Sequence, residues 1–251
     1  MKAAVKYTLA AAVAVLTACG GGGGGTAEQI TPPTLDLRTA WAAYYQQNSS
    51  SNFTVSGSVN GATVGGNGTM IVSYTSPVSV LTTDPASPFP GPSVTLSNVG
   101  KTTLTSNTTL IVNNSQSNVS STQEYYVDST GAFKMIKDVD DDEQTIITSF
   151  TNFPTQVTAG SAGTLYSGTV FSRLGYTCGT ETGSYSVASE SNTALIVTVT
   201  FSQNTTNRTV GQCSTQTSTS QNKYRLTATG LRPVESVGSV STATGSIKLT
   251  F

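Results

Sequence analysis

Residues 194–201 read ALIVTVTF, the most regular alternation of apolar and polar side chains in the chain. Successive side chains of a strand point to opposite faces, so one face of this segment would be apolar and the other mostly threonine. The first face comprises Leu195, Val197, Val199 and Phe201, and the second Ile196, Thr198 and Thr200. This pattern predicts an antiparallel sheet that is covered on one side and faces solvent on the other.

Segments of similar character flank this strand. GSYSVASE (183–190) precedes it and KYRLTATG (223–230) follows it, which predicts a meander of three strands. Nearer the N-terminus, NFTVSGSV (52–59) runs into Asn60-Gly61, a strong signal for a two-residue hairpin turn. The sequence therefore predicts hairpins between neighbouring strands.

The whole of residues 34–251 is interpreted as a β-rich body. We expect a mainly β fold of antiparallel sheets, arranged as a sandwich or as a curved half-barrel, with one N-terminal helix. The proline-rich stretch 84–92 predicts a loop, because proline interrupts the hydrogen-bond ladder of a sheet. Residues 154–163 are weakly patterned and contain glycine, so the body could consist of two halves that meet there.

The predicted helix lies in LDLRTAWAAYYQQ (35–47), with Thr34 as N-cap and Asp36 in the first turn. Its apolar residues recur at helical spacing and comprise Leu37, Trp41, Tyr44 and Tyr45. This face is expected to pack on a sheet, or alternatively to cover a bound ligand.

The N-terminus has the features of an export signal. Lys2 and Lys6 give a positive start, and the apolar run 9–16 is far shorter than the roughly 20 residues that a membrane-spanning helix needs. The run ends in LTAC (16–19), which resembles the lipobox of bacterial lipoproteins. This resemblance implies that residues 1–18 are a signal peptide and that Cys19 becomes the first residue, carrying acyl chains such as palmitate.

The segment after Cys19 is predicted to be a tether. Residues 20–25 are all glycine and cannot readily order themselves, so residues 19–33 would form a lipidated, flexible spacer. Gly20 occupies the position where an aspartate would signal retention in the inner membrane of this lipoprotein class. The resemblance thus implies an outer-membrane lipoprotein that faces the periplasm or the cell surface.

Composition argues against several classes of function. Without Lys2 and Lys6 the formal net charge changes from −1 to −3, and no basic face is evident, so a nucleic-acid partner is not expected. Histidine is absent from the sequence, which excludes catalytic triads and the usual histidine zinc sites. The acidic residues outside one cluster are scattered, so we expect neither enzyme activity nor a cofactor.

Cys178 and Cys213 remain once Cys19 is lipidated, and an even pair in an exported protein predicts a disulfide. Strands on either side of residues 194–201 would lie about 9.5 Å apart. Bridged Cα atoms are rarely more than about 7 Å apart. The two cysteines are therefore expected at the same end of this strand and not across its middle.

The acidic cluster KDVDDDEQT (137–145) offers weak metal-ligand candidates in Asp138, Asp140 and Asp142. Their spacing matches the first ligands of a calcium loop, but Glu143 stands where the loop needs glycine and Ser149 where it needs glutamate. An EF-hand is excluded, and a solvated acidic turn is the preferred interpretation.

Two functions fit these features. In the first, the protein is a membrane-anchored binding or structural module for a protein or glycan partner. In the second, the helix closes a curved sheet that carries or senses a lipid or another hydrophobic ligand. This arrangement is similar, in the order of its elements, to lipoprotein-sorting carriers of the half-barrel type. The first is favoured because the strands are rich in threonine and serine, and an apolar pocket of several hundred Å³ would favour the second.

Overall fold

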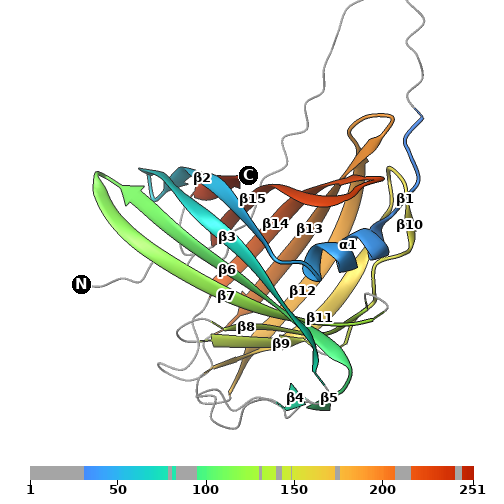
Figure 1. Ribbon diagram of the computed structural model, residues 1–251. Helices are drawn as coiled ribbons and strands as arrows, with labels where there is room; N and C mark the ends of the chain where they lie inside the picture. The colour runs from blue at the N-terminus through green and yellow to red at the C-terminus, as the bar shows by residue number, and fades with distance from the viewer. Residues whose placement is uncertain are drawn as a thin grey trace, which may run out of the picture.

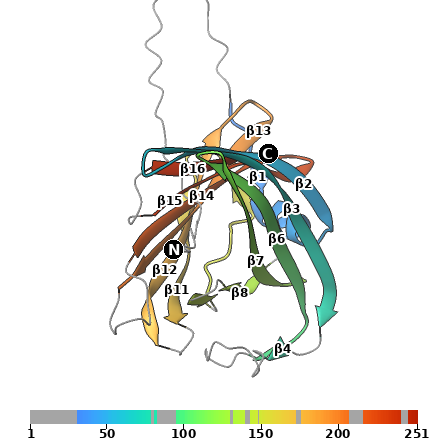
Figure 2. The same cartoon turned by 90° about the vertical axis from the view of Figure 1, so that its left-hand side faces the viewer.

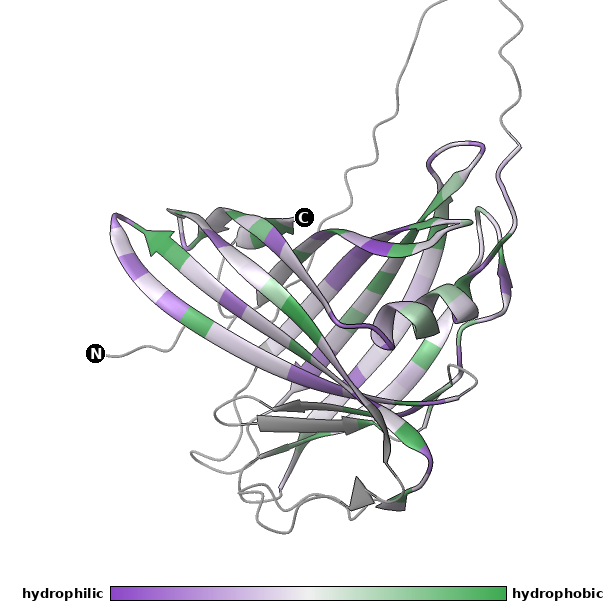
Figure 3. Ribbon diagram, viewed as in Figure 1, coloured by the Kyte–Doolittle hydropathy of each residue, from purple (hydrophilic) through white to green (hydrophobic). Residues whose placement is uncertain are grey.

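The computed structural model describes residues 31–78, 81–82, 95–129, 132–139, 143–147, 149–172, 176–206, 216–240 and 245–251. These residues form one helix and a set of antiparallel strands, which confirms the expected mainly β fold with a single N-terminal helix (Figure 1). Most strand residues have intermediate hydropathy, with isolated apolar bands (Figure 3). This matches a chain whose strands are rich in serine and threonine.

The elements, in chain order, are β1 (Leu35–Asp36), α1 (Leu37–Tyr45), β2 (Ser49–Val59), β3 (Ala62–Val78), β4 (Leu81–Thr82), β5 (Thr95–Leu96), β6 (Val99–Val112), β7 (Ser115–Asp128), β8 (Phe133–Val139), β9 (Glu143–Ile147), β10 (Gln156–Val157), β11 (Ala162–Ser172), β12 (Thr177–Ser189), β13 (Ala194–Thr205), β14 (Gln216–Thr227), β15 (Gly230–Val240) and β16 (Gly245–Thr250).

The main sheet closes on itself as a barrel in the order β11-β12-β13-β14-β15-β16-β2-β3-β6-β7-β8-β9. β11–β16 lie on one side and β3, β6 and β7 on the other (Figure 2). The expected alternatives were a sandwich and a half-barrel, and the structure has a fully closed barrel instead. Every strand of the closed sheet pairs with a neighbour on each side over at least part of its length, whereas a half-barrel has two edge strands that must be protected.

The predicted meander around residues 194–201 is confirmed. β13 pairs with β12 on one side and with β14 on the other, and Val197 lies opposite both Val187 and Tyr224. Leu195 and Val197 are fully buried, whereas Thr198 on the other face is half-buried. The alternation in the sequence therefore identifies the inner face of the barrel.

Tight turns join the long strands. Asn60 and Gly61 both have positive φ, 50° and 78°, which confirms the predicted hairpin turn between β2 and β3. Asn113 and Asn114 adopt the same left-handed conformation between β6 and β7. Asparagine tolerates the left-handed region better than most other residues with a side chain. This preference explains why two asparagines occupy the turn between β6 and β7.

The pairing of β16 with β2 joins segments far apart in the sequence and closes the barrel, and β9 pairs with β11 across the short stretch that contains β10. At the first, the chain end meets an early strand, and the rings of Phe53 and Phe251 lie 5.5 Å apart. Apolar side chains of β2, β3, β6 and β16 form a separate core cluster there, made of Phe53, Val55, Val64, Leu110 and Ile247. Burial of this cluster stabilises the closure.

α1 lies at the barrel end where β2 begins (Figure 1). Its N-cap is Asp36 and not the expected Thr34, and the Asp36 carboxylate accepts a hydrogen bond from the Thr39 backbone N–H at 2.9 Å. The reason is that Leu35 and Asp36 pair with Val157 and Gln156 as a short β ladder. The chain is therefore extended up to Asp36, and the helix starts after it.

Strands on both sides of residues 154–163 belong to the same barrel, since β2, β3 and β6–β9 come before this segment and β12–β16 after it. The segment itself contains β10, which pairs with β1 beside the start of the helix. The backbone N–H of Leu37 also donates to the Thr155 carbonyl at 3.2 Å. This stretch thus helps to hold α1 in place.

Candidate functional site

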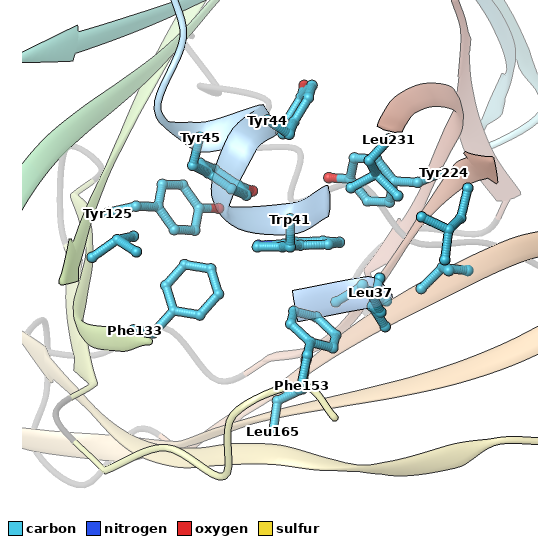
Figure 4. Close-up of a cluster of buried hydrophobic side chains, with 14 of the residues drawn as sticks. Leu37, Trp41, Tyr44, Tyr45, Tyr125, Phe133, Phe153, Leu165, Tyr224 and Leu231 are labelled. Carbon is cyan, nitrogen blue, oxygen red and sulfur yellow. The ribbon is translucent and has the colours of Figure 1, made fainter. Parts of the chain in front are cut away.

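The inward face of α1 fills one end of the barrel (Figure 4). The ring of Trp41 lies 4.5 Å from that of Phe153 and 4.9 Å from that of Tyr224, and the rings of Tyr45 and Tyr125 lie 4.6 Å apart. All four residues predicted from helical spacing, Leu37, Trp41, Tyr44 and Tyr45, are buried in this cluster. Their packing on the sheet is confirmed.

Polar contacts fix the helix to the barrel wall. The Arg38 Nε donates to the Phe153 carbonyl at 2.7 Å, and the buried Thr102 hydroxyl of β6 donates to the Tyr45 carbonyl. The Asn48 side chain accepts from the Tyr74 backbone N–H at 2.8 Å, just after the helix. α1 is therefore held at its start, its end and its exit.

The tyrosine hydroxyls around the helix remain protonated and neutral. Burial raises the pKa of Tyr44, of Tyr45 and of Tyr224 above the usual value of a tyrosine side chain. The Tyr45 side chain also interacts by hydrogen bonding with those of Tyr125 and Tyr224. These groups serve to connect the helix with β7 and β14.

The space left beneath α1 is small. A cavity of about 20 Å³ lies among apolar side chains that include Trp41, Phe133, Phe153 and Leu165. Such a volume holds about one water molecule. An acyl chain would need a pocket of several hundred Å³.

A larger hollow lies on the outer side of α1, between the helix and the β14–β15 hairpin. We call it the hairpin groove, and its volume is about 410 Å³. Its lining residues are Ala40, Ala43, Tyr44 and Gln47 of α1 and its exit, and Arg225, Thr227, Thr229, Gly230, Leu231 and Arg232 of the hairpin. Alanines on the helix leave the groove open, and hydroxyl and guanidinium groups supply its polar contacts.

The charge in the hairpin groove comes from two arginines and one nearby carboxylate. Arg225 donates from Nε to the Glu190 carboxylate at 2.6 Å, and its Nη2 donates to the other carboxylate oxygen. The hydrogen bond from Arg225 lowers the pKa of Glu190, and the positive charges of Arg225 and Arg232 lower it further. The groove therefore has a net positive charge on its hairpin side.

Sequence reasoning missed the hairpin groove. The signal was present in YRLTATGLRP (224–233), where Arg225 and Arg232 stand at equal distances from a turn. A hairpin through this turn would place the two arginines opposite each other, and the structure does so. The contribution of α1 could not be inferred, because the helix lies far away in the sequence.

Of the two cysteines in the predicted disulfide, the structure describes only Cys178. Cys178 is fully buried at the start of β12, and its carbonyl accepts a hydrogen bond from the Thr206 backbone N–H at 3.0 Å, just past the end of β13. Cys178 thus lies at the expected end of β13. Cys213 and the lipidation candidate Cys19 lie outside the described residues, so both assignments stay predictions.

The acidic metal candidates also stay predictions. Asp140 and Asp142 lie outside the described residues, and only the backbone of Asp138 is placed, in β8 opposite Gln123. Within the described ranges, no three residues among histidine, cysteine, aspartate and glutamate come together as metal ligands.

Comparison with protein-family models, with curated proteins and with solved structures finds no match. In the part of the chain that the structure describes, no helix has the length and hydropathy that crossing a lipid bilayer requires. The function therefore has to be argued from the geometry of the barrel and its groove.

Proposed function

We propose that this protein is an outer-membrane lipoprotein, anchored through Cys19, whose barrel binds a partner protein or glycan in the hairpin groove. The observation that carries the proposal is the contrast between two hollows. The groove of about 410 Å³ offers both polar and apolar contacts at the surface, whereas the apolar cavity beneath α1 has only about 20 Å³. Ligand sites in proteins usually have 300 Å³ or more, roughly.

The same contrast weighs against the carrier function. A lipid carrier would leave free apolar space between the helix and the sheet, but Trp41 and its aromatic neighbours fill that space. The helix acts as a plug in this proposal, and its outer side acts as one wall of the binding site.

Binding is proposed in preference to catalysis. The ionic groups of the groove are two guanidinium groups and the Glu190 carboxylate that pairs with one of them. Guanidinium groups recognise anions well but do not release a proton near neutral pH. A Cys178–Cys213 disulfide is part of the proposal and stabilises the barrel without chemistry of its own.

The anchor is tested by growing a Gram-negative bacterium that expresses the full chain with radioactive palmitate. We expect the wild-type protein to be labelled and to sediment with outer membranes. The Cys19→Ala variant should be unlabelled, because no thiol then precedes the glycine run. Equal labelling of both proteins would contradict the anchor.

The groove is tested by placing a photo-crosslinking residue at Thr229, which lines it, and at Asn107, which is exposed on β6. Irradiation of living cells should give a cross-linked adduct of the Thr229 protein that the Asn107 protein lacks. Digestion of the adduct with a protease or a glycosidase identifies the class of partner. Failure of Thr229 to cross-link, or equal adducts from both positions, would overturn the binding role of the groove.

A further inference from the structure

Two like charges face each other in the β14–β15 hairpin. Arg225 and Arg232 are direct cross-strand partners, and the residues beside them, Leu226 and Leu231, point into the barrel and are buried. Like charges directly opposite in an antiparallel pair destabilise a sheet. An anion between or beside the two guanidinium groups offsets this repulsion.

A carboxylate of the chain itself already occupies part of this position. Glu190 follows β12, and its carboxylate accepts two hydrogen bonds from Arg225 in the side-by-side geometry typical of arginine and carboxylate. Arg232 acts on the same carboxylate through its charge, because it contributes to lowering the pKa of Glu190. Both arginines therefore interact favourably with one carboxylate.

Arg232 remains available to a ligand. It is exposed, it lines the hairpin groove, and the described residues offer it no ion pair. Glu190 is also exposed, so a ligand carboxylate can reach Arg225 and compete with Glu190 for it.

We propose that the hairpin groove binds an acidic segment of a partner protein, whose carboxylates replace Glu190 on Arg225 and pair with Arg232. This inference rests on the proposed binding function and narrows the partner to a protein with exposed aspartate or glutamate. Recognition of acidic motifs by arginine clusters is a recurring mode of peptide binding. On the helix side of the groove, the small side chains of Ala40 and Ala43 leave room for a segment of a partner.

A glycan fits the groove less well. Sugars commonly stack on exposed aromatic rings, and the aromatic residue of the groove, Tyr44, is only 4% exposed. The described lining is otherwise made of small, hydroxyl, amide, aliphatic and guanidinium groups. Charge complementarity is thus the strongest feature that the groove offers to a ligand.

The test uses the full chain purified in detergent and a fluorescein-labelled octaglutamate peptide, with octaglutamine as the uncharged control. Fluorescence anisotropy should show binding of octaglutamate but not of octaglutamine. Arg232→Gln should weaken the affinity by about threefold or more, as expected for loss of one exposed charged contact. Glu190→Gln should strengthen it by a similar factor, because Arg225 loses its internal competitor.

Lys101→Gln is the matched control, because Lys101 pairs with Glu124 of β7 and does not line the groove. It should leave the affinity for octaglutamate unchanged, and far-UV circular dichroism should show that all variants remain folded. An effect of Lys101→Gln as large as that of Arg232→Gln would mean that binding reflects overall charge and would overturn the inference.

Three further outcomes would overturn the inference. They are absence of octaglutamate binding, an unchanged affinity in Arg232→Gln, and a weakened affinity in Glu190→Gln. Polygalacturonate is titrated in parallel, and tighter binding of this acidic glycan than of the peptide would assign the groove to a different partner. Cross-linking from Thr229 in cells would still stand in these cases, so the failure of this inference is distinguishable from failure of the proposed function.

Discussion

Replacing Trp41 by alanine is expected to lower the free energy of unfolding by about 3–5 kcal/mol, the usual cost of truncating a buried tryptophan. Trp41 is 3% exposed and contacts aromatic rings from several parts of the barrel, including Phe153 and Tyr224. Its removal would leave a large void beside a cavity that already exists beneath α1. Closely packed cores relax only partly around such a void.

The measurement is urea denaturation followed by far-UV circular dichroism, because Trp41 is the only tryptophan and its fluorescence is lost in the variant. Ala43→Ser is the control on the exposed side of the same helix and should change the free energy by less than about 0.5 kcal/mol. Trp41→Phe should lower the free energy of unfolding less than Trp41→Ala does. Phenylalanine retains an aromatic ring, and no hydrogen bond is lost because the Trp41 Nε1 has no partner among the described residues. Equal effects of Trp41→Ala and Ala43→Ser would show that α1 is not packed as described.

This experiment also separates the two sides of the helix. Trp41 and Tyr45 hold α1 in the barrel, whereas Ala40 and Ala43 line the hairpin groove. If α1 is one wall of the binding site, a loosened helix should weaken binding in the groove even though the arginines of the hairpin are intact. We therefore expect Trp41→Ala to lower both the free energy of unfolding and the affinity for octaglutamate. Arg232→Gln should lower the affinity alone.

Local features of the fold could be predicted from the sequence because their causes are local. The alternation in residues 194–201 identifies the buried face of β13, and helical spacing identifies the buried face of α1. Asn60-Gly61 forms the turn that its conformational preference predicts. In each case the residues that decide the structure are close together in the chain.

Closure of the barrel and the hairpin groove could not be predicted in this way. β16 pairs with β2 from the other end of the chain, and nothing in the pattern of either strand identifies its partner across so many residues. The N-cap position at Asp36 could not be predicted for the same reason, because the pairing of Asp36 with Gln156 keeps the chain extended up to this residue. The groove depends on α1 and the β14–β15 hairpin meeting in space, which only the closed barrel brings about.

Reduction of the predicted Cys178–Cys213 disulfide should lower the free energy of unfolding by roughly 3–4 kcal/mol, since the bond would close a loop of about 35 residues. The described residues make the bond geometrically reasonable. Cys178 lies beside the end of β13 at Thr205 and Thr206, and Cys213 comes three positions before β14 begins at Gln216. The chain therefore passes this end of the barrel just before and just after Cys213.

The disulfide is measured first by intact mass of the protein exported to the periplasm, which should be lower by about 2 Da than that of the reduced chain. Cys178→Ser, Cys213→Ser and the double variant should then lose the same stability, because either single change removes the whole bond. Unequal losses of stability among the three variants would contradict the disulfide. If Cys178→Ser alone were destabilising, the thiol would matter through its burial at the start of β12, and the barrel would be stable without a covalent link.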